Sequence, residues 1–326
     1  MIAPLNHHAY TRLISGFAQD EFTIVPDRVA FTLGSKVEHN NFSGWDVQPN
    51  ARLLWTPHAR HSIWSSAAHA VRTPSYGERN VNVLLATMPP LTGLNPSPYP
   101  VEMLMTGSPD FGSEQVDSYE LGYRIRPTGS LGLTIDAFYN DYDRLRTFRL
   151  GDPIVNLADP VPHITVPMGL VNEAYGYSRG LEFTVDYRPL HWWRVLAAYS
   201  GMRAHLQDKG EYSGATSNTV GENIYPEHQA WARLSFDLAR HYEIDLIPRY
   251  VSAQRNSTVG EFYTADLRVN WRAATGFNVY VAGQDLLGGS HFEFDMPYNM
   301  QTVASKTDPQ LYLGAVWQLG DHHGRQ

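Results

Sequence analysis

Hydrophobic and polar residues alternate along most of the chain with a period of two residues. In the segment 177–188, for example, Leu181 and Phe183 alternate with Glu182 and Thr184. Successive side chains of a β-strand point to opposite faces, so this pattern predicts strands with one apolar and one polar face.

We predict thirteen strands from this pattern, at residues 10–24, 29–41, 46–56, 61–72, 114–126, 131–147, 177–188, 192–206, 226–238, 242–254, 262–273, 277–287 and 309–319. Each run has at least 11 residues, whereas strands of soluble sheets typically have about 5–6 and about 9–11 residues cross a bilayer at a tilt. An antiparallel sheet that covers a soluble core would show the same alternation. The strand lengths favour a sheet that spans a membrane.

The connections between these strands alternate in length. Those on one side are short and rich in turn-forming residues, at 25–28, 57–60, 127–130, 188–191, 239–241 and 274–276. Those on the other side are long, at 73–113, 148–176, 207–225, 254–261 and 288–308, with a short exception at 42–45. Short periplasmic turns and long extracellular loops are typical of bacterial barrels. The pattern therefore predicts an all-β fold, a transmembrane antiparallel up-and-down β-barrel whose long loops bind a ligand.

Composition and charge exclude some classes of function. The chain has no cysteine and a formal net charge of −8, and its Lys and Arg residues are scattered, so we expect no nucleic-acid surface. No run approaches the roughly 18 consecutive apolar residues of a transmembrane helix. The first residues, Met-Ile-Ala-Pro-Leu-Asn, lack the basic and apolar regions of a secretory signal, so we expect no signal peptide within this chain.

The sequence has no catalytic or metal-binding motif. It contains no nucleophile elbow, phosphate-cradling loop or metalloprotease frame, and we expect neither enzymatic activity nor a cofactor. The close histidine pairs lack supporting ligands and are interpreted as solvated: His7 with His8, His58 with His61, and His322 with His323. For Met88, Met103 and Met105 in the segment 73–113, three interpretations stay open, namely loop packing, an apolar ligand surface and a copper(I) site.

Charged residues on the polar strand faces suit the hydrated wall of a barrel lumen. A glycosidase could use a pair of such acids, but interleaved arginines favour a wall balanced by ion pairs. The lumen-facing candidates are Arg124, Glu182, Asp186 and Arg268. Aromatic residues gather near strand ends, as they do at membrane interfaces: Trp45, Trp55, Trp64, Tyr142, Tyr177, Trp192, Trp193, Tyr250, Tyr263 and Trp317.

Several short segments resemble, in order, those of TonB-dependent outer-membrane receptors. Val-Arg-Thr-Pro-Ser-Tyr-Gly-Glu at 71–78 is similar to the Arg-x-Pro-Ser segment of that family, and Ser-Pro-Asp-Phe-Gly-Ser-Glu at 108–114 is similar to its Asn-Pro-Asp-Leu-x-Pro-Glu segment. Further similar segments follow at 118–123, 137–142, 180–183, 225–228 and 311–317. Each segment is weak evidence alone, but the ordered set spans residues 10–320.

The resemblance implies the C-terminal thirteen strands of a 22-stranded barrel, in the outer membrane of a Gram-negative cell. In such receptors an N-terminal plug fills the lumen, and an inner-membrane TonB complex drives the uptake of scarce ligands, most often ferric siderophores. We expect residues 1–326 to form a single partial barrel domain, with a tail at 321–326 and with the plug and the first barrel strands missing. An odd strand count would place the N-terminus outside the cell, which supports missing strands. Such a fragment would not perform energised uptake alone.

The resemblance also suggests which residues meet the ligand. Arg72 and Tyr76 follow the fourth strand, and Tyr175 and Tyr298 lie in later loops; arginine and tyrosine suit large anionic or aromatic chelates. The lumen-facing candidates would face the plug. Residues 75–107 contain no histidine, which makes haem a less favoured ligand. The alternatives are a soluble all-β hydrolase and a diffusion porin without a plug.

Overall fold

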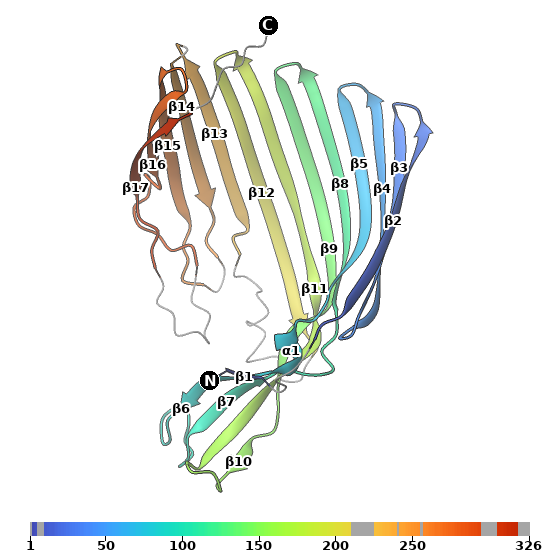
Figure 1. Ribbon diagram of the computed structural model, residues 1–326, viewed down its shortest axis with the longest axis vertical. Helices are drawn as coiled ribbons and strands as arrows, with labels where there is room; N and C mark the ends of the chain where they lie inside the picture. The colour runs from blue at the N-terminus through green and yellow to red at the C-terminus, as the bar shows by residue number, and fades with distance from the viewer. Residues whose placement is uncertain are drawn as a thin grey trace.

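One curved sheet of long antiparallel strands dominates the structure, as Figure 1 shows. The computed structural model describes residues 2–4, 10–209, 225–239, 241–254, 257–294 and 305–318. All thirteen predicted strands are present, as β2 (Leu13–Val25), β3 (Val29–Asn40), β4 (Gly44–His58), β5 (His61–Arg72), β8 (Glu114–Thr128), β9 (Leu131–Leu150), β11 (His163–Leu190), β12 (Trp193–Asp208), β13 (His228–Leu238), β14 (Tyr242–Val251), β15 (Phe262–Ala274), β16 (Phe277–Gln284) and β17 (Gln310–Trp317). The registers pair β2 with β3 and β17 with β16, and these two strands lie at opposite margins of the sheet.

The tight turns use residues that accept a left-handed backbone. Asp27, in the turn between β2 and β3, has φ 59°, and Gly276, between β15 and β16, has φ 74°. Aspartate tolerates this conformation better than most residues and glycine adopts it without steric cost. The amide of Arg28 donates to the carbonyl of Val25 at 3.0 Å and closes the first turn. The predicted hairpin turns are confirmed here.

Two predicted loops contain ordered structure instead. The segment 73–113 forms the short helix α1 (Tyr76–Asn80) and the strands β6 (Val81–Met88) and β7 (Val101–Thr106). The segment 148–176 contains β10 (Ile154–Asn156) and the first half of β11, which begins fourteen residues before the predicted start at 177. The prediction of continuous loops was wrong, because alternating Ile164, Val166, Met168 and Leu170 extend the strand pattern past Pro167.

These loop-side elements continue the same sheet beyond the barrel wall. β7 runs parallel to the start of β11, with Val101 opposite Ile164 and Thr106 opposite Gly169, and β1 (Ile2–Pro4) pairs with β6. The fold therefore departs from a purely antiparallel up-and-down barrel. Figure 1 shows α1, β1, β6, β7 and β10 at the end of the sheet opposite the tight turns. Among the described residues, buried apolar side chains are few, and most lie on this loop side: Phe111, Met168, Leu170 and Ala174.

The sheet has one apolar face with aromatic residues near both ends of the strands. Directly opposed residues of paired strands share a face. When the registers are followed from β3 to β17, the aromatic residues of the apolar face fall into two rows. Near the loops lie Trp45, Tyr119, Tyr139, Tyr177, Tyr250 and Tyr263, and near the turns lie Trp55, Tyr187, Trp193, Tyr242, Trp271 and Trp317.

The spacing of these two aromatic rows fits a membrane. Tyr177 and Tyr187 of β11 are ten residues apart, which is about 33 Å along a strand and about 25 Å along the axis of a barrel whose strands tilt by about 40°. The apolar band of an outer-membrane barrel is about 25 Å tall. Within the part of the chain that the structure describes, no helix is long and apolar enough to cross a membrane.

Two of the predicted interface aromatics lie on the other face. Trp64 is opposite Gly122, and its indole lies so close that a Cβ on Gly122 would come within 2.0 Å of it. The hydroxyl of Tyr142 bonds that of Ser178 at 3.1 Å on the same polar face. The prediction that Trp64 and Tyr142 belong to the interface was wrong, because both residues occupy even positions of strands whose odd positions form the apolar face.

Candidate functional site

The polar face of the sheet brings the four lumen candidates together on one side. Arg124 lies opposite Thr134, which lies opposite Thr184, the residue between Glu182 and Asp186 on this face. Further along the sheet, Asp245 lies opposite Arg268. The polar face continues across the intervening strands: Glu182 lies opposite Ser200 of β12. Arg194, also of β12, lies opposite Ser235 of β13, which lies opposite Asp245 of β14. All four candidates therefore share the face that carries most of the charged strand residues.

Arginine–aspartate pairs neutralise much of this face. Arg194 binds both carboxylate oxygens of Asp186, at 2.9 and 2.8 Å, and Arg233 binds Asp245 in the same two-point way at the same distances. The planar guanidinium matches a carboxylate in this geometry and gives each pair a defined orientation. The guanidinium of Arg268 instead lies over the ring of Tyr280, at 4.4 Å from its centroid. The polar face is thus charged, and many of its charges are paired, as the sequence pattern predicts.

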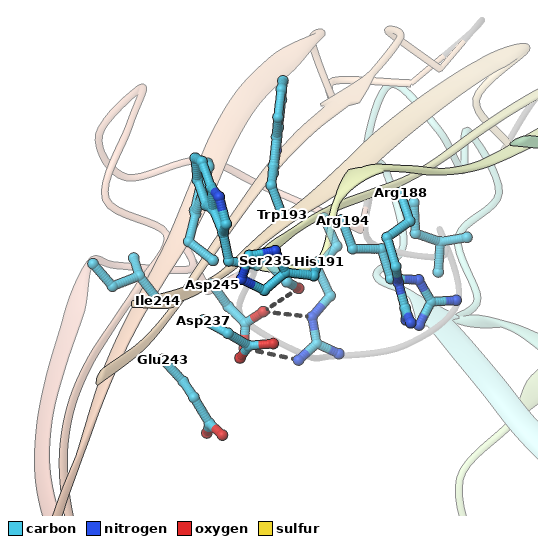
Figure 2. A pocket seen from close by; sticks show the side chains of 13 residues that line it. Arg188, His191, Trp193, Arg194, Ser235, Asp237, Glu243, Ile244 and Asp245 are labelled. Carbon is cyan, nitrogen blue, oxygen red and sulfur yellow. Dashed lines mark hydrogen bonds and ion pairs between the residues drawn. The ribbon is translucent and has the colours of Figure 1, made fainter. Parts of the chain in front are cut away.

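A cavity of about 380 Å³ opens on this face near the tight turns. Figure 2 shows Asp245 within it, with hydrogen bonds to the Ser235 hydroxyl and to a guanidinium group. The lining residues Trp193 and Phe236 belong to the apolar face of the sheet, where their rings stack with centroids 6.1 Å apart. The cavity is a mixed polar and aromatic recess in the barrel wall.

On the loop side, the carboxylate of Glu78 is the centre of a hydrogen-bond network. Arg72 donates to both of its oxygens, at 3.1 and 2.8 Å, and Arg146 donates to one at 3.1 Å. Ser75 caps α1 through the backbone and hydroxyl contacts of a capping box with Glu78. Arg72 also bonds Glu114, the first residue of β8. This network joins the ends of β5, β8 and β9 to α1.

The charge of Glu78 is strongly stabilised. Burial alone would raise the pKa of this carboxyl, but hydrogen bonds from Arg72 and from the amide and hydroxyl of Ser75 outweigh it and lower the pKa to about 2. Glu78 is 5% exposed. It therefore stays ionised at any physiological pH.

A second set of contacts fixes the segment after β7. Arg79 donates to the carbonyls of Phe42 and Phe111, at 2.8 and 2.7 Å. The side chain of Asn172 accepts from the amide of Gly112 at 2.7 Å and donates to its carbonyl at 3.2 Å. The loop between β3 and β4, the segment before β8 and the extended β11 are thereby tied together. We call this connected set of elements, namely α1, the segment before β8 and the extended part of β11, the platform.

The ligand-contact candidates have different surroundings on this platform. Arg72 takes part in the Glu78 network, with its side chain 47% exposed, and Tyr76 is the half-buried first residue of α1. Tyr175, in β11, donates to the side chain of Gln207 at 2.8 Å, and Lys209 lies 5.1 Å from its ring centroid. Tyr298 lies outside the described residues. Arg72, Tyr76 and Tyr175 are all on the loop side, but only Arg72 and Tyr76 are near each other in the chain.

The methionines of the segment 73–113 lie in the loop-side part of the sheet. Met103 and Met105 are in β7, and Met105 faces the buried Met168 of β11 across the parallel pairing. Over the described ranges, no group of three or more His, Asp and Glu side chains could hold a metal ion. The positions of Met103 and Met105 favour the packing interpretation.

Sequence reasoning missed Glu78, Arg79, Arg146 and Asn172. The Ser75-x-x-Glu78 spacing is a helix-start signal and could have identified α1. Nothing local in the sequence indicates that Arg146 reaches Glu78, because the two residues are 68 positions apart.

The sheet has two different faces, tight turns at one end and the platform at the other. This arrangement agrees with the comparison to known families. Residues 4–286 match the family described as TonB dependent receptor-like, beta-barrel. The chain belongs to this family. The barrels of this family lie in the outer membrane of Gram-negative bacteria, and its members are transporters rather than enzymes, which sets aside the hydrolase alternative. No curated protein matches the chain by sequence.

Solved receptors share the fold of this TonB-dependent receptor barrel. The siderophore receptor PirA of Acinetobacter baumannii superposes with a TM-score of 0.73 at 14% identity, over 94% of this chain and 46% of that protein. A variant of the ferric enterobactin receptor PfeA of Pseudomonas aeruginosa gives 0.73 at 14% identity, over 94% and 44%. The FrpB iron transporter of Neisseria meningitidis gives 0.66 at 13% identity, over 94% and 45%. The chain spans a little under half the length of these receptors.

Proposed function

We propose that this chain forms the barrel wall of a receptor that takes up a scarce anionic iron chelate, most specifically a ferric siderophore. The platform around Glu78 is the observation that carries the proposal. Because charge-assisted bonds fix α1, β8 and β9 to one another, the side chains above the wall are held in place for binding. The similar solved structures are a siderophore receptor, a ferric enterobactin receptor and an iron transporter, which supports an iron complex as the ligand.

Tyr175 is the best supported ligand contact of the four candidates. Its ring lies beside the Lys209 ammonium, and together they offer an aromatic surface and a positive charge to an anionic aromatic chelate. Arg72, at the end of β5, and Tyr76, at the start of α1, would add a second contact. Tyr298 stays a prediction for the last long loop.

The polar face would line the lumen through which the ligand passes. Arg124, Glu182, Asp186 and Arg268 would then face a plug domain, which the described residues do not include. Energised uptake would need the TonB complex to act through such a plug. A diffusion porin, the remaining alternative, would need no ligand site on the loop side.

Binding of ferric enterobactin to the purified chain in neutral detergent tests the proposal. We expect saturable quenching of the intrinsic tryptophan fluorescence. A Tyr175→Ala variant should weaken binding by about two- to thirteenfold, since a lost aromatic contact is worth about 0.5–1.5 kcal/mol. Tyr242→Ala, a tyrosine at the turn end of β14, is the matched control and should bind normally. The absence of saturable quenching, or equal weakening by both substitutions, would contradict the proposal.

A further inference from the structure

Two arginines lie side by side on the apolar face of the sheet, just inside the loop-side row of aromatics. Arg179 of β11 and Arg203 of β12 are directly opposite each other in the register. They alternate with Gly180 and Met202 and share their face with Leu181 and the loop-side tyrosines. Both arginines are exposed. Like charges directly opposite on paired strands are destabilising unless something compensates them.

The protein compensates only part of this charge. Arg203 lies 3.4 Å from the carboxylate of Glu227, while the guanidinium of Arg179 lies 5.7 Å from the ring centroid of Tyr177. In the part of the chain that the structure describes, Arg179 makes no ion pair, and Asp141, opposite Tyr177, is not paired with either arginine. The guanidinium of Arg179 therefore keeps a charge without an ion-pair partner among the described residues, on the apolar face of the sheet.

A hollow adjoins the two arginines. It has a volume of about 560 Å³ and is lined in part by both arginines, Leu181, Tyr199, Gly201 and His228. Gly201 makes the space, because a Cβ there would lie 2.8 Å from the hydroxyl of Tyr199. That hydroxyl is hydrogen-bonded to His228 at 2.8 Å, and the two rings stack. The floor of the hollow is thus rigid and largely apolar, and its loop-side rim is cationic.

We propose that Arg179 and Arg203 bind the phosphate group of an anionic lipid in the leaflet on the loop side, with an acyl chain lying over Leu181 and Tyr199. The apolar face of an outer-membrane barrel meets lipid, and its aromatic rows mark the headgroup level. Guanidinium groups bind phosphate through paired hydrogen bonds. A bound phosphate between the two strands would offset the repulsion that the register imposes.

Native mass spectrometry of the full chain in neutral detergent, titrated with phosphatidic acid or with phosphatidylcholine, tests this site. We expect phosphatidic acid to be retained preferentially, and the Arg179→Gln/Arg203→Gln variant to bind it about 30-fold more weakly, from about 1 kcal/mol for each arginine near a lipid surface. The matched control, Arg126→Gln/Arg188→Gln, removes the same charge from exposed arginines near the turns and should retain phosphatidic acid like the parent. Equal retention of the two lipids, or equal loss in both double variants, would overturn the proposal.

Two further measurements keep the test decisive. The heat-induced mobility shift on SDS gels reports whether each variant has folded, and an Arg179→Lys/Arg203→Lys variant, which keeps the charge but not the planar fork, should lose about three- to fivefold in affinity. Inorganic phosphate at the concentration of the lipid should not displace phosphatidic acid. Displacement by inorganic phosphate would show that the patch recognises the free anion and would overturn the lipid assignment.

Discussion

At the scale of single residues, Glu78 has the greatest influence on the loop side. Its carboxylate receives hydrogen bonds from two arginines and from Ser75, although it belongs to a helix of only five residues. Such a short helix has little stability of its own. The network around Glu78, rather than helix propensity, holds α1 in place.

Protonation or neutralisation of Glu78 should loosen the platform. Because the folded pKa of Glu78, about 2, is below its ordinary value of 4.5, its contribution to stability is fully present above pH 4.5 and is lost as the pH falls toward 2. We expect Glu78→Gln to destabilise the segment 76–113 locally by about 1–2 kcal/mol at neutral pH, a discounted value because both guanidinium groups are half-exposed. Amide hydrogen exchange should report about 5- to 30-fold lower protection there.

The pH series provides the control for this prediction. The parent should lose protection in the segment 76–113 between pH 4.5 and 2, and Glu78→Gln should lack that step. Glu120→Gln serves as the matched variant, since Glu120 accepts one hydrogen bond, from Ser66 at 3.2 Å. If the parent and Glu78→Gln showed the same pH dependence, Glu78 would not control the platform.

At the scale of elements, β11 connects the barrel wall to the platform. It has 28 residues, more than twice the roughly 9–11 that cross a bilayer. Its second half pairs with β9 and β12 in the wall, and its first half pairs with β7 and β10 beyond it. Because one continuous strand belongs to both the wall and the loop-side part of the sheet, a displacement of the platform would be transmitted to the wall.

The parallel pairing of β7 with β11 can be tested by cross-linking, since the chain has no native cysteine. Glu102 and Thr165 are directly opposite in this pairing, so Glu102→Cys/Thr165→Cys should form a disulfide under mild oxidation. The measurement is the mass of the linked peptides after digestion. Glu102→Cys/Ile164→Cys is the control, because adjacent strand residues point to opposite faces. Equal cross-linking of both pairs would mean that this register is wrong.

At the scale of the whole molecule, the sheet separates lipid from the proposed lumen by alternation alone. Leu181 and Phe183 are 54% and 41% exposed, which would be unfavourable in water and is expected for side chains that face lipid. The polar face carries the balanced pairs Asp186–Arg194 and Asp245–Arg233. The two sides of the wall therefore suit two different solvents.

Cysteine labelling of the chain in lipid vesicles tests this orientation. We expect Glu182→Cys and Thr184→Cys to react with a membrane-impermeant maleimide at least about tenfold faster than Leu181→Cys and Phe183→Cys, since a thiol in lipid stays protonated and shielded. Gly129→Cys, in a tight turn, should label readily and checks that the reagent is active. Similar rates on the two faces of β11 would rule out this assignment of lumen and lipid.

The sequence by itself determined the thirteen wall strands, the side of each hairpin turn and the two faces, because each depends on neighbours one or two residues away. Leu181 and Glu182 show this most simply, since their side chains fall on opposite faces of any β-strand. The family resemblance follows from the same order of segments. The ion-paired character of the polar face was also predictable, from arginines interleaved with acids.

Only the tertiary structure decided the platform and the pairings within it. Glu78 meets Arg146, and β7 meets β11, across 68 and about 60 positions of the chain respectively, and no local period encodes such contacts. The indole of Trp64 packs against Gly122 of the neighbouring strand β8, a contact that the strand pairing creates. The physical reason is general: alternation decides which way a side chain points, whereas its partner depends on which strand folds against it.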